Sequence, residues 1–505
     1  MGLWAAITWG SALLLALAVI CFLLYCGYVH YIHMKYDHIP GPPRDSFLLG
    51  HLPTVTNAAK NNEVIYDSFL DWVGKYGPLV RINGFHNVYI VVASPEGIKE
   101  LLMSTKYPKD SFYDEIFSIF GTRFLGKGLL SDRDYEHWHK QRRIMDPAFS
   151  RTYLIGLMGT FNEKAEELMQ KLTEKAEKNS EFKVHDMLNK LTLDVIAKVA
   201  FGMDLNTLND DQTPFPRAIF MALRGMLEIR NPLTKILPWK KDLVREIRES
   251  IQLLRKTGKE CIERRRKMSD EGEELPIDIL TQILKGAALE ENCDDEMLID
   301  NFVTFFIAGQ ETTANQLAFA VMELGRHPEI LRKAQDEIDE VIGSKRDIEY
   351  EDLSKLPYLT QVLKETLRLY PTAPGTSRKI EEDMVIEGIK IPGNTTALIY
   401  SYVTGRMEQF FKDPFTFDPE RFAPGALKPY FTYFPFSLGP RSCIGMTFAQ
   451  MEAKVVMTKL LQRFEIQLVD GQSFKILDAG TLRPMDGVIC RLRQRTSVIR
   501  KEKSL

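Results

Sequence analysis

An uninterrupted apolar run opens the chain. Leu3 to Val29 contains no Asp, Glu, Lys or Arg and is rich in Leu, Ala, Ile and Val. About 20 apolar residues span a bilayer, and the aromatic residues near both ends of this run favour the two membrane interfaces. A cleaved signal peptide would need a basic leader, a shorter apolar run and a small-residue cleavage site, none of which is clear here. We therefore predict an uncleaved membrane anchor over residues 1–34.

Basic residues follow this run, whereas none precedes it. By the positive-inside rule, Lys35 and Arg44 predict that the bulk of the chain faces the cytoplasm. Prolines recur in Ile39 to Pro43, and because proline fixes φ and resists helix formation, we interpret residues 35–45 as a stiff Pro-rich spacer. Residues 46–505 contain no linker, repeat or low-complexity segment, so we expect one large globular domain.

Within this domain the hydrophobic pattern is mainly helical. From about Ser94 to Tyr370, apolar residues recur three and four positions apart, as in 161–202 and 241–267. Strand-like runs are short and occur at Leu79 to Ile82, Val88 to Val92 and Val385 to Gly393. A doubly wound α/β protein would show regular alternation of strand and helix, which is missing. The predicted fold class is therefore mainly α with a small β portion.

Charge and cysteine content exclude several classes of protein. The formal net charge is -3, which gives no argument for a nucleic-acid partner. The cysteines are scattered and form neither a CxxC pair nor a finger spacing, so a disulfide framework is not expected. They are Cys21, Cys26, Cys261, Cys293, Cys443 and Cys490.

The strongest chemical signal surrounds one of these cysteines. Phe436 to Gly445 reads F-x-x-G-x-R-x-C-x-G, and its five specified positions match by chance with odds on the order of 10⁻⁴. For Cys443 alone, an inert buried thiol would be the usual interpretation. The surrounding glycines and Arg441 favour a metal-ligating thiolate, because Gly439 and Gly445 allow tight turns and close approach to a cofactor.

This loop resembles the cysteine loop of the cytochrome P450 superfamily. The resemblance implies the fold of that superfamily, a haem b whose iron is ligated by Cys443, and residues 46–505 as a haem-thiolate catalytic domain. A thiolate donates electron density that favours O–O cleavage. The implied activity is monooxygenation with O2, using electrons from NADPH through NADPH–cytochrome reductase. Arg441 is expected to pair with a haem propionate, and Gly445 to belong to the haem-binding loop.

A second motif of the superfamily lies in a long apolar segment that begins near Asp295. AGQETT occupies Ala308 to Thr313 and matches the pattern A/G-G-x-D/E-T. A small residue such as Ala308 leaves room above the iron. The hydroxyl of Thr312 can bond to the carbonyl four residues earlier and open the helix to water. Glu311 and Thr312 are therefore the expected proton-delivering pair, with a Thr-rich patch of buried helix as the structural alternative.

Further family positions are predicted to bind the haem propionates. Trp138 and Arg142 lie one helical turn apart and can both donate to a propionate, although WHKQRR also resembles a surface helix. Arg378 is a third candidate by its position after a proline turn.

A structural network is predicted from E-x-x-R at Glu365 and Arg368. The spacing alone is weak, but here it precedes RLYP and FDPERF in the family order, so Arg421 is expected to complete a buried network that steadies the cysteine loop. Three other pairs with this spacing are interpreted as exposed helix pairs: Glu263/Arg266, Glu323/Arg326 and Glu329/Arg332.

Longer stretches resemble the sterol side-chain hydroxylases of the cholesterol 24-hydroxylase type. They are YDHIPGPP, WHKQRR, NFVTFFIAG, DEVIGSKR and TYFPFSLG. The resemblance implies cholesterol or a related sterol as substrate, and a single-pass protein of the endoplasmic reticulum membrane. Gln310, Pro374, Ser377 and Pro440 depart from that pattern, as does the expected pocket roof at Ser111 to Leu130.

Several alternatives stay open at this point. The substrate is another lipid or a foreign compound in one alternative. In a second, the chain is a haem-thiolate isomerase that needs no reductase. In a third, it is a non-catalytic membrane haem sensor. The presence of Glu311 and Thr312 argues against the isomerase and the sensor, because neither of these proteins would require proton delivery.

Overall fold

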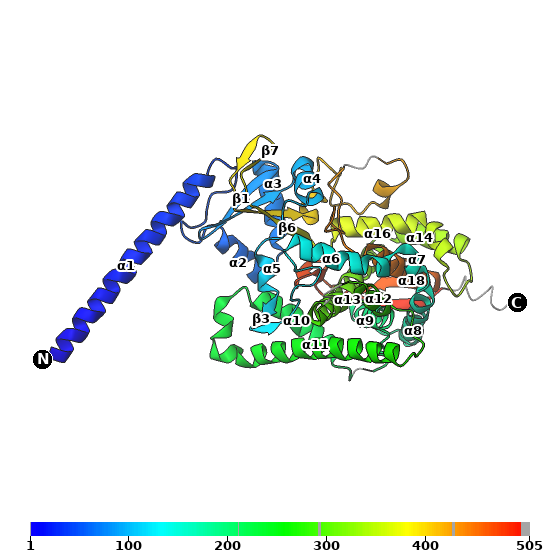
Figure 1. Cartoon of the computed structure of the whole chain (residues 1–505). Coiled ribbons are helices and arrows are strands. Elements are labelled where there is room, and N and C mark those ends of the chain that lie inside the picture. Colours follow the sequence, from blue (N-terminus) through cyan, green and yellow to red (C-terminus); the bar gives the residue numbers. More distant parts are fainter. Residues whose placement is uncertain (1, 211, 291–293, 427–429, 496–505) are drawn as a thin grey trace.

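The computed structural model describes residues 2–210, 212–290, 294–426 and 430–495. Cys293 lies outside them. Helices make up most of the body, and one long helix projects from it (Figure 1). The longer helices are α1 (Gly2–Tyr36), α2 (Leu52–Lys60), α3 (Ile65–Tyr76), α4 (Pro95–Met103), α6 (Tyr135–Met145), α8 (Met158–Glu177), α9 (Val184–Phe201), α10 (Phe215–Glu228), α11 (Lys241–Asp270), α12 (Ile279–Ala287), α13 (Asp295–Arg326), α14 (Pro328–Val341), α16 (Pro357–Leu369) and α18 (Met446–Arg463). The short ones are α5 (Phe112–Glu115), α7 (Arg151–Ile155), α15 (Tyr350–Ser354) and α17 (Ser401–Thr404).

The strands form small, separate sheets. The largest has the order β1 (Leu79–Gly84), β2 (Asn87–Val92), β9 (Thr395–Tyr400), β6 (Gly375–Ile380), with only the β2–β9 pair parallel. A three-stranded sheet joins β10 (Phe464–Leu468), β13 (Ile489–Gln494) and β5 (Phe182–Lys183). Three two-stranded pairs are β3 (Ser118–Ile119) with β4 (Thr122–Arg123), β7 (Met384–Ile386) with β8 (Ile389–Ile391), and β11 (Ile476–Asp478) with β12 (Leu482–Pro484). The predicted fold class, mainly α with a small β portion, is confirmed.

The apolar N-terminal run forms α1. Its segment Trp9–Tyr36 has a mean hydropathy of 2.5 and is long and apolar enough to cross a membrane. Near its C-terminal end, the helix contacts the body through buried Val29 and Tyr36. The Pro-rich segment that follows lies against β1, where the backbone N–H of Arg81 donates to the carbonyl of Pro40 (2.8 Å).

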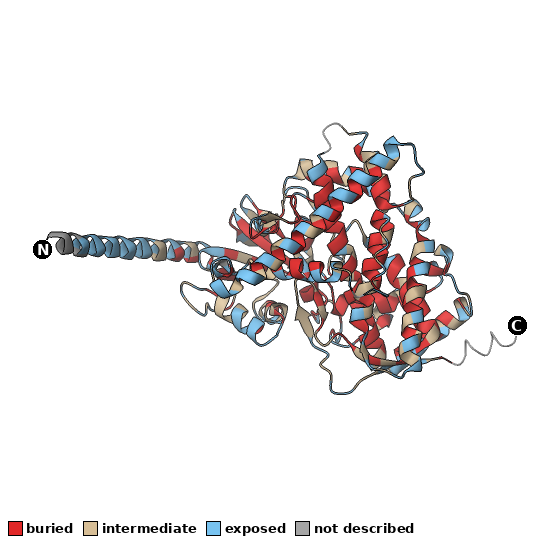
Figure 2. Cartoon of the chain, turned by 90° about the horizontal axis from the view of Figure 1, so that it is seen from below, coloured by how far each residue is buried: buried red, intermediate tan, exposed pale blue. Residues whose placement is uncertain are grey.

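The buried parts of the helices lie in the interior of the body (Figure 2), and most residues of α13 are buried. Its residues Asn301–Ile307 are all buried, because this stretch is apolar except for one Asn and one Thr. Helix α9 packs along it, with Phe201 and Phe302 in ring contact at 4.0 Å. Because α13 is largely buried, a solvent-accessible residue on it points to a candidate site.

Candidate active site

The cysteine loop, residues 436–445, lies immediately before α18. It is closed by backbone hydrogen bonds from Cys443 N–H to the Phe436 carbonyl (2.9 Å) and from Ser442 N–H to the Gly439 carbonyl (3.0 Å). Gly439 has φ +67°, and a Cβ there would lie 2.2 Å from the Leu102 carbonyl oxygen. Glycine is thus required at this position both by the left-handed turn and by the close approach of the C-terminal end of α4.

The thiol of Cys443 is accessible and yet enclosed. The residue is exposed, but burial by the surrounding protein raises its pKa. The backbone N–H of Gly445 and the charge of Arg142 oppose that rise, since both lower the pKa of the thiol. A Cβ on Gly445 would contact only the Cys443 sulfur, at 3.8 Å. The accessible sulfur is therefore flanked by two groups that favour the thiolate.

A second accessible surface lies on α13. Ala308 is exposed and Thr312 half-buried, although Ile307, Glu311 and Thr313 beside them are buried. Residues four apart share one helix face, so Ala308 and Thr312 form a narrow accessible strip. The Thr312 hydroxyl donates to the Ala308 carbonyl (2.8 Å), as the sequence predicted.

Three cations, of which Lys109 and Arg378 are buried and Arg441 is half-buried, lie close together without an ion pair among the described residues. Lys109, Arg378 and Arg441 are absent from the ion pairs of the described residues. Burial and, second to it, the charge of Arg378 lower the pKa of Arg441 to about 10. Burial is the main reason that the pKa of Lys109 lies well below its usual range, and repulsion from Arg378 and Arg441 lowers this pKa further. Unpaired buried charges are costly, so this cluster indicates a site for an anionic group.

The contacts of these cations leave their charge uncompensated. Arg441 stacks over the buried Trp138 ring at 4.0 Å and donates to the Asp132 carbonyl (2.8 Å). Arg378 donates to the Thr376 hydroxyl (3.0 Å) and the Ser377 carbonyl (2.8 Å). These acceptors are neutral. The two carboxylates of a haem supply the missing charge, so the residues present fit that cofactor.

Arg142 and Trp138 have different surroundings. The Arg142 guanidinium donates to the Ser442 carbonyl (2.7 Å) and to Asp146 (2.6 Å), so it contacts the cysteine loop. Trp138, one turn earlier, lies under Arg441 instead. The structure therefore brings Trp138, Arg378 and Arg441 together with Lys109, which the sequence analysis missed because nothing in its local pattern separates it from a surface lysine.

The predicted Glu–Arg–Arg network is present in the fold. Arg368 and Glu365 are fully buried and joined by two hydrogen bonds of 2.7 Å. Arg368 also donates to the carbonyls of Gly405 (2.6 Å) and Pro414 (2.7 Å). Arg421 completes the set at 3.4 Å from Glu365. These contacts join α16 to the segment at 405–421, so they reach the cysteine loop only through that segment.

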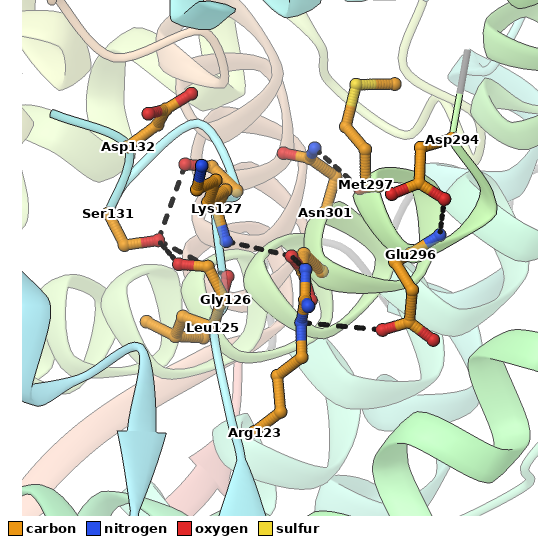
Figure 3. Close-up of polar contacts among 12 residues, drawn as sticks. Arg123, Leu125, Gly126, Lys127, Ser131, Asp132, Asp294, Glu296, Met297 and Asn301 are labelled. Carbon is orange, nitrogen blue, oxygen red and sulfur yellow. Dashed lines mark hydrogen bonds and ion pairs between the residues drawn. The ribbon is translucent and has the colours of Figure 1, made fainter. Parts of the chain in front are cut away.

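The expected pocket roof is held by an ionic cluster that the sequence analysis did not identify. Arg123 on β4 forms a bidentate pair with the fully buried Asp300 of α13 (3.0 and 2.6 Å). Arg255 on α11 donates to the same carboxylate (2.7 Å), and Glu296 lies 3.4 Å from Arg123 (Figure 3). The backbone N–H of Lys127 also donates to Asp300 (2.8 Å). A loop far from α13 in sequence is thereby fixed to it.

Comparison with known proteins agrees with this geometry. Residues 40–490 match the family described as cytochrome P450. Cytochrome P450 3A16 of Mus musculus is 29% identical over 531 residues, which covers 99% of each chain. Cytochrome P450 4d8 of Drosophila melanogaster is 30% identical over 455 residues, covering 84% of this chain and 96% of the relative. With a cysteine loop, an accessible strip on the central helix and a family match over most of its length, the chain belongs to the cytochrome P450 family.

Proposed function

We propose that this chain is a membrane-anchored haem-thiolate monooxygenase in which Cys443 would hold the iron of a haem b. One observation carries the proposal: an accessible thiol occurs together with a cluster of buried and half-buried cations that form no ion pair among the described residues. A haem requires both, a thiolate for its iron and cations for its propionates. The bound haem supplies the chemistry that activates O2 and inserts one oxygen atom into an apolar substrate.

On the side of the cysteine loop, the chain's own residues stabilise negative charge. The Gly445 N–H and Arg142 both lower the pKa of Cys443, which favours the thiolate form needed for ligation. Lys109, Arg378 and Arg441 receive the propionates, and Trp138 holds the Arg441 guanidinium in place by stacking.

On the other side, Thr312 and Glu311 handle protons. The Thr312 hydroxyl uses its hydrogen toward the Ala308 carbonyl, so its oxygen lone pairs remain free to accept hydrogen bonds from water along the accessible strip. Glu311 exchanges protons with that water. This acid–alcohol pair favours a reductase-dependent monooxygenase over an isomerase or a haem sensor. NADPH-dependent product formation with reductase separates the three.

The ligand assignment is tested by Cys443→Ser. The parent protein reduced under carbon monoxide should give the red-shifted absorption band of a thiolate-ligated haem, and the variant should lose it. Because a misfolded variant would also lose the band, helical circular dichroism is measured in parallel. A folded variant that retains the red-shifted band would exclude Cys443 as the ligand.

For the substrate, we propose the side chain of cholesterol or a related sterol. Support comes from the long stretches similar to sterol side-chain hydroxylases. The departures from that pattern are accommodated locally, since Ser377 donates to Asp110 (3.0 Å) and Gln310 to Asn189 (2.7 Å). Titration with cholesterol, a fatty acid and a foreign aromatic compound, followed by the haem absorption shift, tests this. A shift with the fatty acid or foreign compound alone would exclude the sterol proposal.

We further propose that NADPH–cytochrome reductase docks on α6. Arg142 of this helix contacts the cysteine loop. The Arg143 side chain is 63% exposed and forms an ion pair with Glu290 (2.6 Å). Lys140→Glu with Arg143→Glu should slow haem reduction by the reductase at low salt, because charge steers encounter. Lys256→Glu with Lys259→Glu, an equal charge change on α11, is the control. An equal rate for the α6 variant and the parent would exclude this surface.

The location we propose is the endoplasmic reticulum membrane, crossed once by α1, with the body in the cytoplasm. Asn394-Thr395-Thr396 is a glycosylation sequon, and Asn394 is exposed. Its glycosylation requires the lumenal compartment, so no glycan is expected. An endoglycosidase-sensitive mass shift that Asn394→Gln removes would overturn this topology.

A further inference from the structure

A chain of hydrogen bonds leads from Glu311 to a buried histidine on another helix. The Thr481 hydroxyl, just before β12, donates to Glu311 Oε1 (3.2 Å). Asn315 Nδ2 donates to that hydroxyl oxygen (3.0 Å). Asn315 Oδ1 lies 2.6 Å from His185 Nε2. These four residues link α13, β12 and α9, and none of them is charged except Glu311.

The chemistry of these groups gives the chain one direction. An amide oxygen only accepts, so His185 Nε2 must carry the hydrogen that it shares with Asn315. The Asn315 amide nitrogen then faces Thr481 and occupies a lone pair of its hydroxyl oxygen. A hydroxyl has a single hydrogen, and here it is left to donate to Glu311. The orientation of the imidazole is therefore transmitted to the carboxylate.

His185 is well placed to act as the fixed end. It is buried, and its backbone N–H donates to the Gly487 carbonyl (3.1 Å). Asn189 Nδ2 lies 3.2 Å from each ring nitrogen. Burial lowers the pKa of His185 and favours the neutral ring. Glu311 and Asp186 raise that pKa and Arg483 lowers it.

We propose that His185 is a positioning residue for Glu311 and acts through Asn315 and Thr481. This series of hydrogen bonds fixes one carboxylate oxygen of Glu311 on the β12 side and leaves the other oxygen to exchange protons near Thr312. This inference rests on the proposed role of Glu311 and Thr312 in proton delivery. It adds a residue from α9, outside the family motifs, to the machinery that orients the acid.

The test compares two substitutions at this one position. His185→Leu removes the ring donor at similar volume, whereas His185→Gln keeps an amide N–H that can donate to Asn315 Oδ1. With His185→Leu, hydrogen peroxide released per NADPH oxidised should rise severalfold. The infrared C–O stretching band of the carbon monoxide complex should also shift or split, because a released carboxylate changes the field near the haem. His185→Gln should restore both values toward the parent.

Two controls separate a positioning role from general damage. Val195 is buried on α9, away from these hydrogen bonds. Val195→Ala should therefore lower stability and leave peroxide release and the C–O band unchanged. If Val195→Ala, at equal loss of thermal stability, matches His185→Leu in both readouts, the positioning role is excluded. It is equally excluded if His185→Gln fails to differ from His185→Leu.

Glu311→Gln distinguishes failure of this inference from failure of the proposed function. If peroxide release is unchanged in Glu311→Gln, proton delivery by Glu311 is wrong. If Glu311→Gln raises peroxide release but His185→Leu does not, only the role of His185 is wrong. If both raise it, the double variant should leak no more than Glu311→Gln alone, since the two residues act in one chain. An additive increase would contradict the inference.

Discussion

Two clusters of buried charge show opposite ways of accommodating arginine in the core. Arg368 is fully buried against the equally buried Glu365 and two backbone carbonyls. Arg378 is buried and Arg441 half-buried; the hydrogen bonds of both go to neutral acceptors, and both repel Lys109. The first cluster has its counter-charge within the chain. The second has no ion pair among the described residues, although the charges of Asp110 and Asp132 act on it.

The difference indicates which cluster is structural and which binds a ligand. A buried charge with its counter-charge in place stabilises one arrangement of the chain, and removing one partner is strongly destabilising. Buried cations that lack a counter-charge make folding less favourable unless something supplies it. We therefore expect substitutions in the two clusters to have opposite effects on the cofactor-free protein.

The largest effect is expected for Arg368→Ala. It removes both 2.7 Å hydrogen bonds to the buried Glu365 and leaves only Arg421, at 3.4 Å, as a counter-charge among the described residues. Removing one partner of a buried pair costs about 3–5 kcal/mol of unfolding free energy. Thermal unfolding of the purified protein measures it. Arg332→Ala is the control, because Arg332 has the same spacing from Glu329 but is exposed, and its effect should stay within about 0.5 kcal/mol. Equal losses in the two variants would contradict the structural role of the network.

Arg378→Met should act in opposite directions on two measurements. Without haem, the variant should be as stable as the parent or more stable, because an unpaired buried cation has been removed. The free energy of haem binding should become less favourable by about 1.5–3 kcal/mol, the contribution of a hydrogen bond to a charged group. Competition for haem with apomyoglobin and thermal unfolding of the cofactor-free protein give the two values. A variant that loses stability without haem and keeps its haem affinity would reverse the assignment.

How far the sequence predicted these clusters depends on their local pattern. Glu365 and Arg368 were found because the spacing and the motifs after it are local in the chain, and Cys443 and Thr312 for the same reason. Arg378 and Arg441 were identified only through the resemblance to a family. Lys109 and Asp300 were not identified, because tertiary packing brings their neighbours from distant parts of the chain. These are Arg378 of β6 and Arg441 of the cysteine loop for Lys109, and Arg123 of β4 and Arg255 of α11 for Asp300.

The same limit applies to the fold. Helical periodicity predicted the helix-rich middle of the chain. The strand-like run predicted at Val385 to Gly393 is divided in the structure into the hairpin of β7 and β8, because Glu387 and Gly388 form a turn in which both have positive φ. The C-terminal strands β10 to β13 were not predicted. They are short and pair with distant partners such as β5, so their stability comes from packing rather than from a local signal.

Asp300→Asn tests a third, balanced cluster that fastens a loop. The variant keeps the size of the side chain but removes the charge that Arg123 and Arg255 share. We expect a loss of about 1–2 kcal/mol in unfolding free energy and faster proteolysis within residues 116–130. Asp295→Asn, which removes an exposed partner of Arg266, is the control. Unchanged proteolysis would show that the loop is held by its apolar contacts alone.

A last prediction concerns a buried acid, Glu452, whose ionised form has no counter-charge among the ion pairs of the described residues. Both carboxyl oxygens of Glu452 on α18 lack a hydrogen-bond partner among the described residues. Burial raises the pKa of Glu452 well above its usual range, and Thr313 opposes only part of that rise. Here the excess charge is removed by protonation. The acid stays neutral in the folded protein, whereas in the unfolded chain it ionises above about pH 4.3. Folding therefore becomes less favourable as pH rises above that value, by up to about 1.4 kcal/mol per pH unit until the folded-state pKa is reached.

Glu452→Gln should remove this loss, so it should stabilise the protein at pH 7 and have little effect near pH 4. Thermal unfolding across that range measures it, with Glu177→Gln on the exposed face of α8 as the control. A variant that is less stable than the parent at pH 7 would show that Glu452 is ionised and paired in the folded protein.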